Sequence, residues 1–110
     1  MTHSLGGATG GGLGTLLISK LKEEYCEKTM CSMPVIPACK TDCLVEPYNF
    51  VLSNNQLIEN ADQVMCFDLD KLYDICFRIL KLNIPRYKDI NSIVSTTMNN
   101  ITSLYRYKSN

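Results

Sequence analysis

The chain has 110 residues, of which 45% are hydrophobic and 20% charged, and its eleven basic and eleven acidic residues cancel to a formal net charge of zero. These are globular values that exclude disorder, and a neutral chain has no basic footprint for nucleic acid. No apolar run is long enough for a membrane span, and Met1 is not followed by a signal-peptide pattern. We therefore expect a cytoplasmic protein with no nucleic-acid or membrane partner.

Six cysteines raise the question of disulfides or zinc. Neither is supported, because the chain has no signal peptide and no C-x-x-C motif, and its only histidine, His3, is far in sequence from any thiol pair. The closest pair, Cys39 and Cys43, has a spacing within the broad range of metal sites. We expect free thiols, several of them buried in strands and helices, and no metal site.

All six glycines lie between positions 6 and 14, in the stretch Gly6-Gly7-Ala8-Thr9-Gly10-Gly11-Gly12-Leu13-Gly14. Glycine adopts φ > 0 easily and lets a ligand approach the backbone, so such a run can direct several N–H groups at one anion. The helix predicted directly after it would add its positive end. The pattern favours a phosphate-binding loop, and a flexible linker or a tight turn into the helix is the alternative.

Two common nucleotide loops are not matched here. The Walker A pattern requires Gly-Lys followed by Ser or Thr, whereas Gly12 is followed by Leu13. The dinucleotide fingerprint G-x-G-x-x-G fits residues 10–15 only with a mismatch, because Thr15 stands at the position of its last glycine. No complete strand precedes it. A small dehydrogenase-like domain therefore rests on a poor match.

The first predicted helix has apolar residues at three- and four-residue steps. Its expected buried face consists of Leu13, Leu16, Leu17, Leu21 and Tyr25. A strand is predicted over 29–36, in which Pro34 is awkward for a central position and weakens strand pairing. A loop over 37–42 follows.

A second helix is predicted to start at Glu46-Pro47, since proline is tolerated in a first turn. Its expected buried side comprises Tyr48, Val51, Leu52, Leu57 and Ile58. A strand over 63–67 comes next, and Asp68 is a candidate N-cap for a third helix. That helix keeps helical spacing at Leu69, Leu72, Tyr73, Cys76, Phe77 and Leu80. A fourth helix from about Arg86 presents one broad apolar face: Tyr87, Ile90, Ile93, Val94, Met98, Ile101, Leu104 and Tyr105.

The stretch over 2–20 closely resembles the glycine-rich signature of tubulins, G-G-G-T-G-S-G. Later stretches resemble the β branch of that family in the same order, namely Glu23-Glu24-Tyr25, Val45-Glu46-Pro47-Tyr48-Asn49, Gln56-Leu57-Ile58-Glu59-Asn60 and Leu72-Tyr73-Asp74-Ile75-Cys76-Phe77-Arg78. The resemblance implies an α/β fold, part of a Rossmann-like GTPase domain with two to three parallel strands and four helices. Residues 1–110 would be the middle and C-terminal part of that domain, truncated and ending with its central helix.

The resemblance also implies the site residues. Ser4, Ala8, Thr9 and Gly10 match phosphate-binding positions. Asp42 and Glu46 match residues near the ribose, where a carboxylate accepts hydrogen bonds from both hydroxyls. Tyr87 matches the tyrosine that stacks on the base, and Asn91 and Leu69 match the two asparagines that bind its edge. The family's magnesium ligand has no counterpart in this chain, and no catalytic residue is expected in it.

Two of these positions, Ala8 and Leu69, depart from the family, and so does the neighbouring position Gly11. Ala8 replaces a glycine, which costs on the order of 1 kcal/mol if the position needs φ > 0. Gly11 replaces a serine. Leu69 replaces a base-binding asparagine, so guanine selectivity is the property most affected, because an unpaired base group costs about 1–3 kcal/mol.

By resemblance, then, the chain is a GTP- or GDP-binding segment of a microtubule protein, with magnesium as companion ion and α-tubulin and other tubulin subunits as partners. Its expected location is the cytoplasm and cytoskeleton. Hydrolysis in the family needs a neighbouring subunit's loop, so enzymatic activity stays open. The alternative is an inactive tubulin-derived fragment without nucleotide binding, acting at most as an interaction piece.

Overall fold

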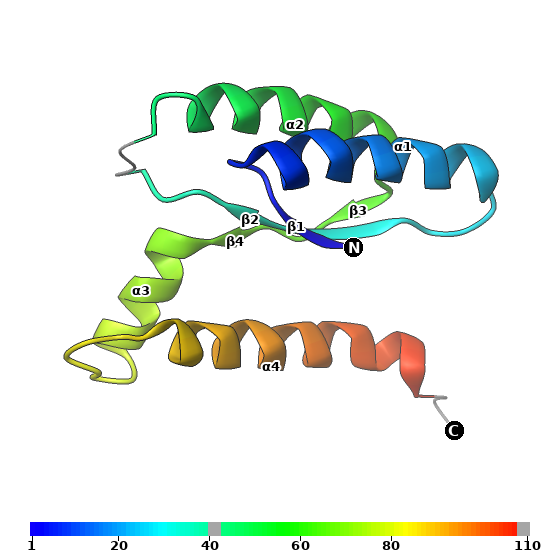
Figure 1. Ribbon diagram of the computed structural model, residues 1–110. Helices are drawn as coiled ribbons and strands as arrows, with labels where there is room; N and C mark the ends of the chain where they lie inside the picture. The colour runs from blue at the N-terminus through cyan, green and yellow to red at the C-terminus, as the bar shows by residue number, and fades with distance from the viewer. Residues whose placement is uncertain (40–42, 108–110) are drawn as a thin grey trace. The chain divides into compact units, whose positions relative to one another are not determined.

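The structure, a computed structural model, describes residues 1–39 and 43–107, which divide after Leu69 into two compact units. The first unit contains the strands β1 (Thr2–Ser4), β2 (Cys31–Ile36), β3 (Gln63–Val64) and β4 (Phe67–Asp68). It also contains a π-helical turn, η1 (Thr9–Leu13), and the helices α1 (Gly14–Glu24) and α2 (Glu46–Asn60) (Figure 1). The helix α3 (Leu69–Arg78) begins at the division, and α4 (Tyr87–Arg106) belongs to the second unit.

All strand pairs of the first unit are parallel, and β2 is the central strand. On one side β1 pairs with it in the register Thr2↔Met33 to Ser4↔Val35. On the other side β3 and β4 both pair with it, and α1 and α2 cross over the same face of the sheet (Figure 1). The predicted α/β class with parallel strands is confirmed.

Pro34 explains why β3 and β4 are two short strands. Ser32↔Val64 and Val35↔Phe67 share one register, so β3 and β4 are parts of one strand whose break lies opposite 33–34. By this register the backbone nitrogen of Pro34 faces the gap, and proline has no N–H to donate there. The weakened pairing that the sequence predicts is therefore localised at the interruption between β3 and β4.

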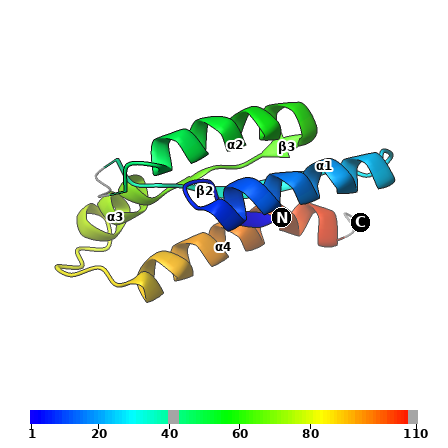
Figure 2. The same ribbon diagram turned by 45° about the horizontal axis from the view of Figure 1, so that its top comes forward.

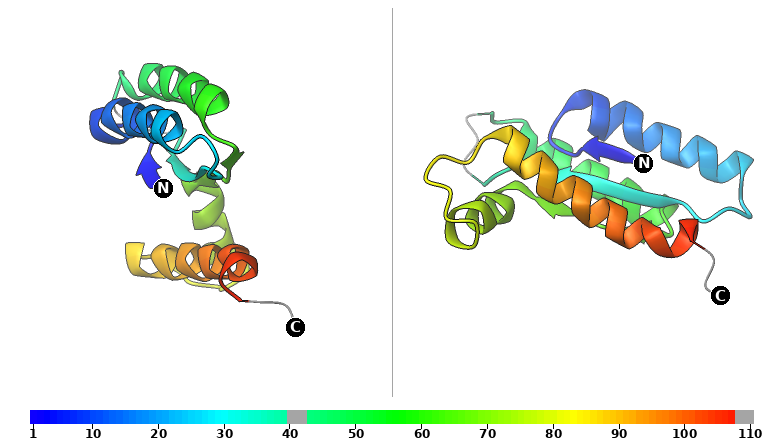
Figure 3. Two further views of the ribbon diagram at one scale, coloured as in Figure 1. Left: turned by 90° about the vertical axis from the view of Figure 1, so that its right-hand side faces the viewer. Right: turned by 90° about the horizontal axis from the view of Figure 1, so that it is seen from below.

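The buried face of α1 is not the predicted one. Gly14, Thr15 and Ile18 are buried, whereas the expected face is exposed at all five positions: Leu13, Leu16, Leu17, Leu21 and Tyr25. The physical reason is close packing, since the helix approaches the sheet and α2 through its smallest residues. Figures 2 and 3 show α1 and α2 side by side. Leu5, Ile18 and Leu57 form the core between these elements.

In α2 the start at Glu46 and Pro47 is confirmed, but most of the expected buried side is wrong. Ser53 and Leu57 are buried, while four expected members are exposed: Tyr48, Val51, Leu52 and Ile58. The small side chain of Ser53 is buried at this position because α2 lies close against the glycine-rich turn at Gly11. A prediction that places the largest apolar side chains on the buried face therefore fails for α2 for the same reason as for α1.

The second unit consists of the rest of α3 and of α4. In α3, Leu72 and Cys76 are buried and Phe77 is exposed, so the expected face is only partly right. In α4, Ile90 is buried, but Tyr87, Leu104 and Tyr105 are exposed. The carboxylate of Asp89 accepts the Arg86 N–H at 3.0 Å and closes the first turn of this helix. The predicted start near Arg86 is confirmed.

None of the six cysteines, all of which lie in the described part of the chain, is in a disulfide, and only Cys76 is fully buried, where the sequence suggested several buried thiols. Within residues 1–39 and 43–107, no group of three His, Cys, Asp or Glu side chains is placed to hold a metal ion. Over the same residues, none of the helices combines the length and the apolar character needed to cross a bilayer.

Asp62 ties together three elements at the amino ends of the strands. Its carboxylate accepts two hydrogen bonds from Lys22 Nζ at 2.6 and 2.7 Å and one from the Met30 N–H at 2.8 Å. Its own N–H donates to the Met30 carbonyl at 3.0 Å. The hydrogen bonds from Lys22 and then from Met30 lower the pKa of Asp62 below its usual value of 3.8.

Replacing Pro34 by valine, written Pro34→Val, restores an amide at the interrupted pairing while keeping similar apolar volume. By the register this amide would face the Met65 carbonyl. We expect the free energy of unfolding in urea to rise by about 1 kcal/mol. Pro47→Val is the control, since a first-turn amide has no intrahelical acceptor, and it should give no such gain. Equal effects of the two substitutions would contradict the interpretation.

Asp62→Asn removes the charge from the junction. Because the folded-state pKa of Asp62 is lowered, its ionised form contributes stability above pH 3.8, and that contribution is lost as pH falls through the folded pKa. The melting midpoint of the variant should therefore be lower at pH 6, and the gap to wild type should narrow in acid. Glu23→Gln, which disrupts an exposed pair with Lys20, is the control and should change the midpoint less. A constant gap from pH 6 to pH 2 would rule out the ionised Asp62 as the cause.

Candidate functional site

The candidate site lies at the carboxyl edge of the sheet, where parallel strands of open α/β sheets present their loops to ligands. The loop after β1 and the first turn of α2 meet there. A Cβ atom on Gly6 would lie 3.2 Å from Cβ of Pro37 and 3.4 Å from Cδ of Glu46. The Asn49 side-chain amide donates to the Gly6 carbonyl at 3.0 Å. The structure thus brings the glycine loop and Glu46 together, as the resemblance implies.

From Ala8 onward the glycine-rich run is helical and does not use the left-handed backbone that glycine allows. No glycine among the described residues has a positive φ, and Ala8 has φ −64° and ψ −41°. Ala8 therefore carries no backbone strain in place of the family's glycine. The π-helical turn Thr9–Leu13 continues directly into α1. A single π turn within an α-helix is a frequent feature of functional sites.

Glycine is required here by close approach rather than by φ. A Cβ atom on Gly10 would overlap the Ser4 carbonyl oxygen and lie 2.8 Å from the Ser4 nitrogen. One on Gly11 would lie 2.5 Å from Oγ of Ser53. By contrast, a Cβ on Gly12 has no neighbour within 4 Å among the described residues. The turn is therefore pressed against β1 and α2 on one side and open on the other.

The open side carries the backbone groups suited to an anion. The first turn of a helix leaves N–H groups without intrahelical partners, and here that turn begins at Ala8. Ala8 and Thr9 are exposed and Gly10 is half-buried. Ser4, exposed at the end of β1, accepts the Gly6 N–H on its Oγ at 3.3 Å. Together these groups can receive a phosphate without a lysine.

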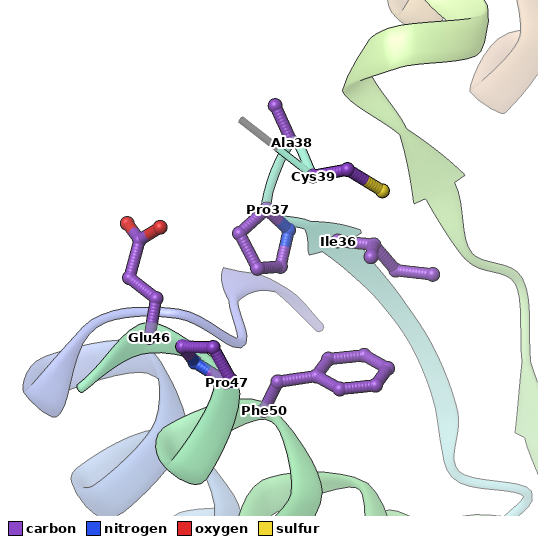
Figure 4. Close-up of a pocket in the computed structure, with 7 residues that line it drawn as sticks. All are labelled: Ile36, Pro37, Ala38, Cys39, Glu46, Pro47 and Phe50. Atoms are coloured by element: carbon purple, nitrogen blue, oxygen red, sulfur yellow. The ribbon is translucent and has the colours of Figure 1, made fainter. Parts of the chain in front are cut away.

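A pocket of about 210 Å³ lies between the loop after β2 and the start of α2 (Figure 4). Its walls are mostly apolar, including Ile36, Pro37 and Phe50, and among the described residues that line it only Glu46 is acidic. The Oε2 atom of Glu46 is buried and has no hydrogen-bond partner among the described residues. A buried carboxylate oxygen needs a donor, because it can only accept. The pocket is smaller than most ligand sites and suits one part of a larger ligand.

Some predicted site residues are not placed with these. Asp42 lies outside the described residues. Leu69 is half-buried at the start of α3, and Tyr87 and Asn91 are exposed in the first two turns of α4, in the second unit. The ring of Tyr87 is 73% exposed, and its side chain hydrogen-bonds to Tyr73. Burial raises the pKa of Tyr73, and the adjacent Tyr87 adds to the rise.

Sequence reasoning missed two residues that hold the loop. Asn49 reaches the Gly6 carbonyl from the first turn of α2, where an amide side chain is a recognisable signal. His3 donates from β1 to the Gly10 carbonyl, and its place directly before the glycines was the available sign. Thr15 Oγ1 also bonds to the Gly11 carbonyl at 2.6 Å and closes the π-helical turn.

The parallel sheet and the glycine-rich helix start at its carboxyl edge define a Rossmann-like α/β protein. The sequence profile of the Tubulin/FtsZ family, GTPase domain, matches residues 1–77. Since this covers well over half of the chain, the chain belongs to that family.

Curated relatives agree with the family assignment. The chain is 55% identical to the tubulin beta chain of Coprinopsis cinerea and 55% identical to that of Schizophyllum commune. It is 56% identical to the nucleomorph tubulin beta chain of Guillardia theta. Each match covers 108 residues, which is 97% of this chain but 24% of the relative. The expected β-tubulin-like segment is thus confirmed, and it spans about a quarter of those proteins.

Two substitutions in one turn test the close approach. Gly10→Ala should lower the free energy of unfolding by about 2–3 kcal/mol, because its methyl group overlaps the Ser4 backbone. Gly12→Ala should raise it by about 0.5–1 kcal/mol, because the methyl group meets open space and alanine favours a helix. Urea unfolding of the full chain measures both. If Gly12→Ala were as harmful as Gly10→Ala, the turn would not be packed as described.

Proposed function

We propose that the carboxyl edge of the sheet binds a guanine nucleotide, GTP or GDP, as part of a tubulin-like nucleotide-binding domain. The observation that carries the proposal is the buried Oε2 of Glu46 beside Gly6, which has no hydrogen-bond partner among residues 1–39 and 43–107. A ribose has two adjacent hydroxyl groups that donate to one carboxylate, so it supplies the missing partner. The small, mostly apolar pocket fits a sugar better than a whole nucleotide.

The phosphates would lie against the helix start. The first turn consists of Ala8, Thr9 and Gly10, and Ser4 lies beside it at the end of β1. The N–H groups and the positive dipole end of this turn favour an anion. The helical φ of Ala8 supports this role, since the methyl group there imposes no strain. Magnesium would accompany the phosphates and screen their charge, while the chain's own part is to bind and orient them.

By resemblance, we propose Tyr87 and Asn91 as the residues that bind the base. The exposed ring of Tyr87, held by its hydrogen bond to Tyr73, offers a flat surface for stacking. Asn91, one helical turn further along α4, can donate to and accept from the edge of a base. Leu69 has no polar group to add, so the selectivity for guanine would depend on Asn91. Asp42 is proposed as a second ribose ligand by resemblance.

At the level of the whole protein, we propose association with α-tubulin and other tubulin subunits in the cytoplasm and cytoskeleton. The names of the relatives, tubulin beta chains, support this role. We also propose that residues 1–110 are the middle and C-terminal part of the nucleotide-binding domain. Hydrolysis of the bound nucleotide would require groups that this stretch does not supply.

A second candidate is an interaction segment without nucleotide binding. A row of exposed leucines that begins at the end of η1 and continues along α1 favours it, because large exposed apolar patches mark contact surfaces. The row comprises Leu13, Leu16, Leu17 and Leu21. A thermal melt with and without nucleotide distinguishes this candidate from nucleotide binding.

A thermal melt of the full chain with magnesium, comparing GTP, ATP and no nucleotide, tests the proposal. A ligand at 100 times its dissociation constant adds about 2.7 kcal/mol, which moves the midpoint of a domain of this size by several degrees. We expect a rise with GTP and a smaller one with ATP. No rise with either nucleotide would favour the interaction segment instead.

Glu46→Gln tests the ribose contact. We expect about tenfold or greater weakening of GTP binding, because charge-assisted hydrogen bonds contribute about 1.5–3 kcal/mol. The midpoint without nucleotide should not fall, since the substituted oxygen has no partner among the described residues to lose. The control is Glu59→Gln, an exposed carboxylate at the far end of the same helix, which should leave affinity unchanged. Equal affinities for wild type and Glu46→Gln would remove Glu46 from the site.

A further inference from the structure

His3 is the only histidine of the chain, and both of its ring nitrogens are engaged. Nδ1 lies 2.8 Å from the carbonyl oxygen of Gly10, and Nε2 lies 3.0 Å from Oγ of Ser32. Ser32 is fully buried on β2, and His3 is half-buried on the neighbouring strand β1. One imidazole therefore connects two strands with the π-helical turn.

These partners determine where the proton sits on a neutral ring. A carbonyl oxygen can only accept, so Nδ1 must carry the hydrogen that is shared with Gly10. Nε2 is then unprotonated and accepts the hydroxyl hydrogen of Ser32. The two hydrogen bonds fix both the tautomer and the orientation of the ring.

The bond to Gly10 acts on the turn that carries the proposed phosphate ligands. Because the peptide unit is planar, holding the Gly10 carbonyl also fixes the Gly11 N–H, which donates to the Gly7 carbonyl at 2.9 Å and so anchors the first turn. A π turn is an unusual backbone that needs support from outside the helix. His3 supplies such support from the sheet, next to the close contact between the Gly10 and Ser4 backbones.

We propose that His3 is a positioning residue of the glycine loop, whose Nδ1–H holds the Gly10 carbonyl so that the first-turn amides meet phosphate in the correct geometry. The inference rests on the proposed nucleotide site. His3 is not a general base here, since neither ring nitrogen is available to a ligand.

Two isosteric substitutions separate the two hydrogen bonds. In His3→Asn the side-chain amide nitrogen takes the place of Nδ1 and keeps the donor to Gly10 but not the contact to Ser32. In His3→Gln it takes the place of Nε2 and keeps the contact to Ser32 but not the donor. We expect GTP affinity, measured by titration of the full chain with magnesium, to weaken at least fivefold in His3→Gln and less than twofold in His3→Asn.

The unfolding midpoint is the accompanying measurement. Each variant loses one hydrogen bond of the ring, so a merely structural role would change affinity and stability in parallel in both. A loss of affinity confined to His3→Gln, at similar midpoints, supports the positioning role. Equal affinities of the two variants would overturn it. Ser32→Ala, which keeps the donor to Gly10, should retain wild-type affinity.

A nucleotide-free measurement keeps the inference separate from the proposed function. With one histidine in the chain, ¹⁵N spectra of the ring are unambiguous and report which ring nitrogen carries the hydrogen. We expect a protonated Nδ1 and an unprotonated Nε2, with faster amide exchange in residues 10–13 of His3→Gln than of His3→Asn. The opposite tautomer would overturn the role of His3 even if GTP binds. Failure of wild type to bind GTP, with the expected tautomer present, would instead refute the nucleotide site.

Discussion

The backbones of Gly10 and Ser4 lie so close together that no side chain fits between them, and the packing of the first unit depends on this approach. With the turn pressed against β1, His3 can reach the Gly10 carbonyl, and Gly11 admits Ser53 of α2. Leu5, Ile18 and Leu57 are then close enough to exclude water from one core. A methyl group at Gly10 would act on every one of these contacts, because densely packed interiors transmit strain.

The order of the four α-helices and of β2 could be predicted from the sequence, because local signals decide them. The strand β1, the π-helical turn and the division between β3 and β4 were not predicted. Glu46-Pro47 marked a helix start, and the glycine run preceded a helix as expected. The buried faces of α1 and α2 could not be predicted in the same way. Periodicity analysis assigns the largest apolar side chains to the buried faces. In this structure the buried faces of the two helices instead contain Gly14, Thr15 and Ser53 beside Ile18 and Leu57. Close approach is a tertiary property that no single helix reveals.

The residues of the candidate site could likewise be predicted only in part. Glu46 could be named from resemblance, and the structure adds that one of its carboxylate oxygens is buried with no donor in the part of the chain that the structure describes. Asn49 and His3 escaped notice because their partners are backbone carbonyls of Gly6 and Gly10, and carbonyls leave no mark in a sequence. The helical φ of Ala8 could not be foreseen either, since glycine in a loop is compatible with several conformations.

The junction around Asp62 lies at the amino ends of the strands, whereas the candidate site lies at their carboxyl ends. The two share no residue, and distant sites without common partners contribute almost additively to stability. Substitutions at the junction can therefore be accumulated without altering the loop of the candidate site. Because the two regions are separate, residues around Asp62 can change in sequence while the glycine turn stays the same. The same region is where stabilising substitutions can be introduced.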